Sequence, residues 1–237
     1  MTKPFKFKQF TIHQDKTAMK VGTDGVLLGA WAAVQPEVFS ILDIGSGTGL
    51  IALMLAQKSN AEVIDAIELN DEAYEQTVEN FEQSDWGDRL FCYHASLQEF
   101  VDEIEDEYDL IISNPPFYTS TYKELSEERA MARHTESLTY KELLEGTSKL
   151  LAKNGSCAFI IPFQEEEKFI VQAKEYRLFP NRITRVKGTE NTSIKRSLLQ
   201  CSFVENSPSE NKLIIEIERH KYTQDYINLV QDFYLKM

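Results

Sequence analysis

The stretch Leu42-Asp43-Ile44-Gly45-Ser46-Gly47-Thr48-Gly49 decides the fold. It closes a short apolar run at 39–44, and strong helix formers occupy 49–57, so the pattern predicts a strand, a glycine-rich loop and a helix. Small residues in such a loop let a ligand approach the backbone closely. In open α/β sheets, ligands bind at the carboxyl ends of the parallel strands, which is where this loop lies. We therefore expect a ligand site here.

The rest of the chain continues the alternation of strands and helices. Strands are expected at 62–69, 90–94, 108–113 and 156–161, and helices at 71–83, 143–151 (ended by Asn154-Gly155) and 164–176. This spacing predicts an α/β fold with a doubly wound, mainly parallel, Rossmann-like sheet. Three further strand-like runs at 182–187, 197–204 and 212–218 follow without helices between them, before a last amphipathic helix at 223–235. We expect the sheet to finish antiparallel.

The composition excludes several classes of protein. With 38 acidic and 25 basic residues the net charge is -13, which argues against broad electrostatic attachment to nucleic acid or to anionic lipid. Basic residues do cluster at 3–20 and at 182–196, so a local basic face is possible. The three cysteines are odd in number and far apart, which favours neither disulfides nor a metal site. The chain has no predicted signal peptide or membrane span, so we expect a cytoplasmic protein.

The spacing of the glycines indicates which cofactor to expect. A dinucleotide fingerprint reads Gly-x-Gly-x-x-Gly, whereas the glycines here are Gly45, Gly47 and Gly49, and Leu50 takes the third glycine's place. The spacing resembles the first motif of class I methyltransferases. That resemblance implies that Asp43 orients the loop and that the glycines contact the amino-acid part of S-adenosylmethionine.

Two more positions are candidates for contact with the nucleoside of this cofactor. Glu68 ends the second strand, where a carboxylate can accept both ribose hydroxyls, and its position matches the ribose-binding acid of the family. Family members often carry an acid after the third strand to bind the adenine amine, whereas this chain has Ser96 there. Either Ser96 or backbone groups are expected to take that role.

Asn114-Pro115-Pro116-Phe117 follows the fourth strand and indicates which atom is methylated. Two prolines fix the backbone and lack amide donors, so the Asn114 side chain and the Pro115 carbonyl can be held as outward-facing acceptors. Two acceptors suit an NH2 group, and they favour the pyramidal geometry in which the nitrogen lone pair points at the methyl. Phe117 can stack on a base.

The amino-terminal segment carries the most specific resemblance. Residues 5–10 and 19–31 resemble the segment that precedes the cofactor loop in bacterial tRNA1(Val) adenine-N6 methyltransferases, which modify the adenosine 3′ of the anticodon. The resemblance implies that Lys20, Thr23, Asp24 and Gly25 lie over the methionine part of the cofactor. It also implies one methyltransferase domain over 1–237, in which 1–35 contributes to the site and 36–237 forms the core.

The resulting hypothesis is direct transfer of a methyl group from S-adenosylmethionine to N6 of an adenine in tRNA, with no metal and no strong general base. Alternatives remain at this point. Asn-Pro-Pro also serves enzymes that methylate a protein glutamine at N5 or an rRNA guanine at N2. A nucleotide-binding module without catalysis is a third possibility, against which the intact Asn114 argues. The sequence predicts no oligomeric state.

Overall fold

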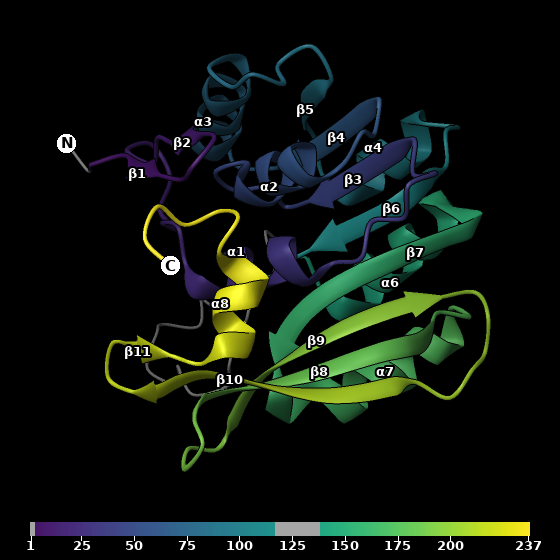
Figure 1. Ribbon diagram of the computed structural model, residues 1–237. Helices are drawn as coiled ribbons and strands as arrows, with labels where there is room; N and C mark the ends of the chain where they lie inside the picture. Colours follow the sequence, from purple (N-terminus) through teal and green to yellow (C-terminus); the bar gives the residue numbers. More distant parts are fainter. Residues whose placement is uncertain (1–2, 117–137) are drawn as a thin grey trace, which may run out of the picture.

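The computed structural model describes residues 3–116 and 138–237. Its centre is a nine-stranded sheet with the order β11-β10-β8-β9-β7-β6-β3-β4-β5 (Figure 1). The strands of this sheet are β3 (Ser40–Ile44), β4 (Val63–Glu68), β5 (Leu90–His94), β6 (Tyr108–Ser113), β7 (Leu151–Pro162), β8 (Phe179–Thr189), β9 (Ile194–Ser202), β10 (Ser209–Glu218) and β11 (Lys221–Tyr222).

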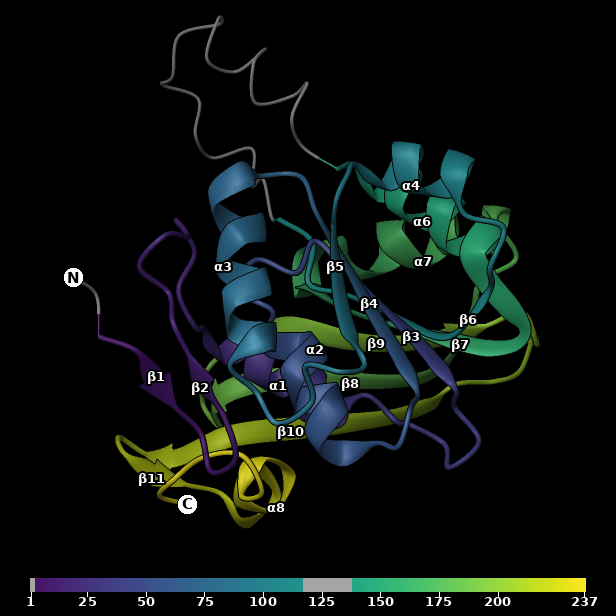
Figure 2. The ribbon, with the colours of Figure 1, turned by 90° about the horizontal axis from the view of Figure 1, so that it is seen from above.

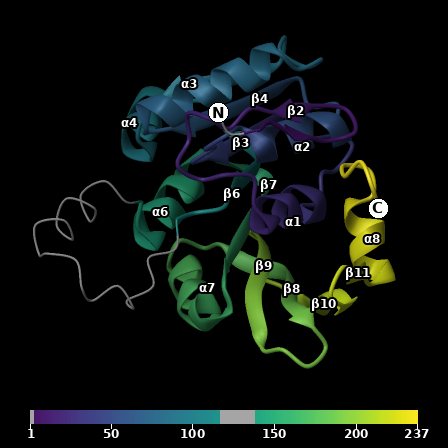
Figure 3. The same ribbon diagram turned by 90° about the vertical axis from the view of Figure 1, so that its left-hand side faces the viewer.

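Helices cover both faces of the sheet. They are α1 (Thr23–Trp31), α2 (Leu50–Lys58), α3 (Asp71–Glu82), α4 (Leu97–Glu103), α6 (Tyr140–Leu150), α7 (Glu166–Glu175) and α8 (Gln224–Val230), together with the short 3-10 helix η1 (Phe163–Glu165). Figure 3 shows α1, α2 and α8 on one side of the strands, and α6 and α7 on the other. Successive residues of β3 point to opposite faces of the sheet. Ile41 belongs to the hydrophobic core beneath α1, α2 and α8, and Leu42 belongs to the core beneath α6 and α7. No helix among the described residues has the length and apolar character needed to cross a bilayer.

The predicted α/β class with a parallel sheet is confirmed, and so is the antiparallel end. Strands β5, β4, β3, β6 and β7 are mutually parallel, whereas β9 runs antiparallel to both β7 and β8. The later β10 returns parallel to β8. Since β9 lies between its neighbours β7 and β8, it joins the parallel part of the sheet to the carboxyl-terminal strands.

Two predicted boundaries were wrong. Asn154-Gly155 does not end a helix: α6 stops at Leu150, and both residues lie within β7, where the pairing with β6 shifts register. Gly155 is needed there because a Cβ would come 2.9 Å from the Tyr108 carbonyl oxygen. The last helix, α8, ends at Val230 instead of continuing to 235.

The beginning of the chain folds against its end. A small hairpin pairs β1 (Phe5–Lys6) with β2 (Thr11–Ile12) (Figure 2). Phe7 bridges to Tyr234, and the Lys8 N–H donates to the Phe233 carbonyl oxygen at 2.8 Å. The rings of Phe7 and Tyr234 stack at 5.7 Å. Aromatic packing therefore holds this hairpin beside the carboxyl-terminal segment.

Candidate active site

The glycine-rich loop connects β3 to α2 through three glycines with positive φ. Gly45, Gly47 and Gly49 have φ of 74°, 62° and 73°, a region that side chains other than glycine rarely adopt. The N–H groups of Gly45 and Ser46 donate to the Ile67 carbonyl oxygen at 2.9 and 3.1 Å, which ties the loop to the end of β4. A Cβ at Gly45 or Gly47 would meet nothing within 4 Å. This side of the loop is therefore open to a ligand.

Asp43 lies beneath this loop and is fully buried. Its Oδ2 accepts the Ala52 N–H of α2 at 3.2 Å, while Oδ1 has no hydrogen-bond partner among the described residues. Burial raises the pKa of Asp43 to about 7 from the ordinary value of 3.8, although the Ala52 hydrogen bond opposes the shift. The carboxylate supports the start of α2 and thereby the loop.

This raised pKa predicts a specific dependence of stability on pH. Between pH 4 and 7 the folded protein holds a proton on Asp43 that the unfolded chain has released, so this group lowers the free energy of unfolding as pH rises. The slope is at most about 1.4 kcal/mol per pH unit. In Asp43→Asn the contribution is absent, so in urea denaturation the parent should lose stability relative to the variant across this range. Parallel stability curves would show that Asp43 titrates normally.

Glu68, the predicted ribose-binding acid, lies against the loop. Its Oε2 accepts the Gly47 N–H at 2.8 Å, and its Oε1 accepts the Asn70 N–H at 2.9 Å. Asn70 in turn caps α3 by accepting the Ala73 N–H. The partly exposed carboxylate thus stands between the glycine loop and the start of α3, where two hydroxyl groups could reach it.

Asn114 follows β6 directly, next to the end of β3. In the register of these strands Ser113 is opposite Ile44, and the Ser113 hydroxyl donates to the Ile44 carbonyl oxygen at 2.8 Å. Asn114 therefore lies beside the residue that begins the glycine loop. Its Oδ1 is buried and has no hydrogen-bond partner among the described residues. Buried oxygens normally have partners, so an unpaired one beside an open loop indicates a ligand donor. Pro115 is buried, and Phe117 lies outside the described residues.

The amino-terminal candidates surround the start of α1. Gly25 packs against the first residue of α2, since a Cβ there would come 3.1 Å from Leu50 Cδ2. Thr23 is the first residue of α1, and the Asp24 carboxylate pairs with Arg196 Nε of β9 at 2.8 Å. Lys20 Nζ donates to two backbone carbonyl oxygens of the preceding turn, each at 2.5 Å. Lys20 and Asp24 are therefore held by protein contacts.

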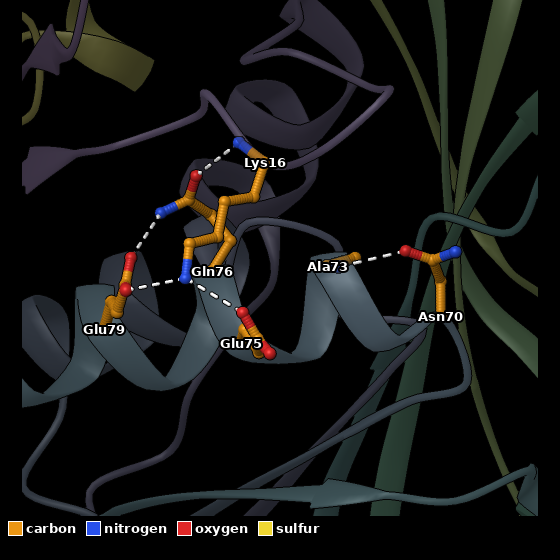
Figure 4. Close-up of polar contacts among 6 residues, drawn as sticks. All are labelled: Lys16, Asn70, Ala73, Glu75, Gln76 and Glu79. Atoms are coloured by element: carbon orange, nitrogen blue, oxygen red, sulfur yellow. Dashed lines mark hydrogen bonds and ion pairs between the residues drawn. The ribbon is translucent and has the colours of Figure 1, made fainter.

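Buried polar residues of α3 hold this amino-terminal segment, a feature that the sequence analysis missed. The Lys16 N–H donates to Gln76 Oε1 at 3.0 Å, and the Lys16 ammonium pairs with Glu75 and Glu79 at 2.9 and 2.7 Å (Figure 4). Asn80 exchanges two hydrogen bonds with the His13 backbone, and its amide also donates to the Thr48 carbonyl oxygen. Asn80 thus joins the segment to the glycine loop. The sequence signal for these contacts was a set of polar residues on the otherwise apolar face of α3, namely Gln76, Thr77 and Asn80.

Ser96 has a local role. It caps α4 in a capping box, in which its hydroxyl donates to the Glu99 carboxylate and accepts the Glu99 N–H. Both hydrogen bonds lie within the protein, so backbone groups are the better candidates for contact with an adenine. Among the described residues, no group of three His, Cys, Asp or Glu side chains could hold a metal ion.

The three arginines of the basic cluster at 182–196 have partners within the described residues, whereas Lys195 is exposed. The Arg182 guanidinium lies 4.2 Å from the centre of the Trp31 ring. Arg185 pairs with the buried Glu166 at 2.7 Å and with Glu210 at 2.8 Å. Arg196 forms an ion pair with Asp24, so three cations of this cluster have partners inside the protein.

Comparison with known proteins agrees with this geometry. A family model described as Methyltransferase small domain matches residues 26–173. The Flavobacterium johnsoniae protein named tRNA1(Val) (adenine(37)-N6)-methyltransferase is 60% identical over 234 residues, which cover 98% of this chain and all of that protein. Among solved structures, an Agrobacterium tumefaciens protein titled a predicted O-methyltransferase has a TM-score of 0.71 at 18% identity, covering 89% of this chain and 96% of that one. M. jannaschii TYW2 in complex with AdoMet has a TM-score of 0.56 at 14% identity, with 84% of each chain covered.

The parallel sheet with its glycine-rich loop after β3, together with the matched family model, defines a methyltransferase. The fold class and the methyltransferase assignment predicted from the sequence are therefore confirmed. At 60% identity over nearly its full length, the chain belongs to the family of tRNA1(Val) (adenine(37)-N6)-methyltransferases.

Proposed function

We propose that this protein transfers a methyl group from S-adenosylmethionine to N6 of an adenine in tRNA, namely the adenosine 3′ of the anticodon of tRNA1(Val). The name of its relatives supports the reaction and the substrate. The observation in the structure that carries the proposal is the Oδ1 of Asn114, which is buried and unpaired beside the open side of the glycine loop. An exocyclic amino group supplies the donor that this oxygen lacks.

The cofactor is proposed to lie across the glycine loop. Gly45 and Gly47 leave space for it, and Asp43 holds the loop from below. The ribose hydroxyls would bind Glu68, displacing its backbone donors in part. Thr23 and Gly25 at the start of α1, with Lys20, Asp24 and Gly49 around them, would close over the methionine part. The adenine would bind near Ser96, chiefly through backbone groups.

The main contribution of the protein to this reaction is to position the amino group against the methyl group. S-adenosylmethionine supplies a methyl group on a positively charged sulfur, which is already activated. Asn114 Oδ1 and the Pro115 carbonyl oxygen would accept the two hydrogens of the amino group and so direct its lone pair at that methyl. Phe117 would stack on the base. The extra proton can leave after methylation, so a general base is not required.

The experiment that tests the proposal offers the protein unmodified tRNA and isotopically labelled S-adenosylmethionine. Nucleoside mass spectrometry should find N6-methyladenosine in tRNA1(Val) and none in a tRNA1(Val) whose target adenosine is replaced by guanosine. Ribosomal RNA and a glutamine-containing protein serve as parallel substrates for the two alternatives. Label in either of these, with none in tRNA, would overturn the assignment.

The proposed cofactor contacts make a second prediction. At about pH 8, above the pKa of Asp43, Asp43→Ala and Glu68→Ala should each weaken S-adenosylmethionine binding by about 1.5 to 3 kcal/mol, since each removes a charged hydrogen-bonding group. Glu68→Gln keeps one acceptor and should lose less. Isothermal calorimetry measures these affinities, and Glu82→Ala, at the far end of α3, is the matched control. Unchanged affinity in both alanine variants would show that the cofactor does not bind at this loop.

We further propose that residues 1–237 act as one domain in the cytoplasm, where the tRNA pool is found. The hydrogen bonds from α3 to the amino-terminal segment support the first point, because they make residues 13–16 part of the same unit as the glycine loop.

A further inference from the structure

A second pocket lies between the amino-terminal hairpin and the carboxyl-terminal elements. Its volume is about 630 Å³, within the usual range for ligand pockets. In Figure 1 the arrowheads of β3 and β6 point toward the side of the molecule on which β1, α8 and β11 lie. Thr23, at the start of α1, lines this pocket and precedes Asp24. The pocket therefore shares Thr23 with the candidate active site.

Four aromatic side chains line this pocket, namely Phe5, Tyr222, Tyr226 and Tyr234. Phe5 and Tyr234 lie 6.1 Å apart between ring centres, and Tyr222 lies 5.3 Å from Tyr226. Tyr226 is buried, so its ring is held in the wall of the pocket. Phe5, Tyr222 and Tyr234 are only half-buried, so part of each ring stays accessible. Rings held in this way can stack on a planar heterocycle.

The charges around the pocket suit an anion attached to such a heterocycle. Lys6 and Lys236 are both exposed on its lining. Glu216 is the one carboxylate side chain among the described lining residues, and its Oε1 accepts the His220 N–H at 3.2 Å. A base that stacks on aromatic rings, joined to a phosphate that meets lysine, is the chemistry of an unpaired nucleotide.

We propose that this pocket binds one unpaired nucleotide of the tRNA substrate, distinct from the methylated adenine. The inference rests on the proposed function. It accounts for how a chain with a net charge of -13 holds RNA, since stacking supplies affinity that does not depend on overall charge. It also accounts for the aromatic pairing of the hairpin with the carboxyl-terminal segment, which builds the pocket.

The test compares aromatic residues at the two opposite edges of the sheet. Tyr222 lies in β11 at one edge, and Phe91, which is 44% exposed, lies in β5 at the other. With single-turnover methylation at saturating donor, Tyr222→Ala should raise the tRNA concentration for half-maximal rate by about fivefold to a hundredfold, the effect of losing one stacked base. The maximal rate and the calorimetric affinity for S-adenosylmethionine should stay within twofold of the parent. Phe91→Ala should leave all three unchanged.

A second arm identifies the nucleotide. In anticodon stem-loops carrying one abasic position each, removal of one loop base other than the target should weaken binding to the parent but not weaken binding to Tyr222→Ala further. Lys6→Glu, which leaves the rings intact, should weaken tRNA binding and make it less dependent on salt. If Tyr222→Ala does not fold, Lys6→Glu and the abasic series on the parent decide the matter.

Two results would overturn the inference, and they are distinguishable. If the parent methylates tRNA while Tyr222→Ala and Lys6→Glu bind it like the parent, the pocket has no part in RNA binding and the proposed function stands. If the parent methylates no tRNA, the proposed function fails and this inference fails with it.

Discussion

Replacing Asn114 by alanine is expected to slow methyl transfer to tRNA by about a hundred- to a thousandfold, which corresponds to roughly 2.7 to 4 kcal/mol of transition-state stabilisation. The magnitude is that of losing one preorganised hydrogen-bonding group from an active site. In the parent, the Asn114 oxygen is already buried and unpaired at the strand end, so no reorganisation is needed when the amino group arrives.

Single-turnover rates at saturating donor and saturating tRNA separate this effect from binding. Melting temperature and S-adenosylmethionine affinity should stay close to those of the parent, since removing an unpaired oxygen breaks no hydrogen bond of the described structure. Asn181→Ala, in which a partly buried asparagine of β8 loses only a weak 3.4 Å contact with Ser202, is the matched control. Transfer by Asn114→Ala at the parent rate would show that this loop does not orient the substrate.

Two glycines of the glycine-rich loop should respond to alanine in different ways. In Gly49→Ala the new methyl would lie 2.6 Å from Phe81 Cε1 and 3.1 Å from Thr77 Cγ2, at a φ of 73°. Overpacking costs about 1 to 3 kcal/mol and the left-handed backbone about 1 to 2 kcal/mol, so we expect the protein to lose roughly 2 to 5 kcal/mol of stability. Urea denaturation measures the loss.

Gly47→Ala is the matched variant, because it has a similar φ of 62° but nothing within 4 Å of the added methyl. It should lose only the backbone contribution, about 1 to 2 kcal/mol. Its methyl would instead occupy the space proposed for the cofactor, so its S-adenosylmethionine affinity should fall sharply. Equal stability losses in the two variants would mean that the Phe81 contact relaxes freely, and an unchanged affinity in Gly47→Ala would place the cofactor elsewhere.

The placement of the candidate-site residues that follow strand ends could be predicted from the sequence. The glycine loop, Glu68 and Asn114 each come directly after an apolar run, and parallel strands bring such positions to one edge of the sheet. Local pattern and sheet geometry were sufficient for these residues.

The contacts between distant segments could not be predicted in this way. Gln76 and Asn80 lie among the apolar positions of α3 in the sequence, but only the fold shows that they bind the backbone of Lys16 and His13. Asn154-Gly155 has the composition of a turn, yet both residues lie inside β7, where the pairing with β6 shifts register. Nothing local distinguishes a solvated arginine from one paired with a carboxylate far along the chain, as Arg196 is with Asp24.

The position of β9 between β7 and β8 constrains the order of events during synthesis. Strands β3 to β7 leave the ribosome early and can pair with one another, whereas β8 has only β9 and β10 as neighbours, and both are made after it. A nascent chain that has reached the end of β8 therefore exposes the open edge of β7 and an unpaired strand at the same time. Such edges favour aggregation, so the connection between β8 and β9 is the point in translation at which a chaperone is most useful to this chain.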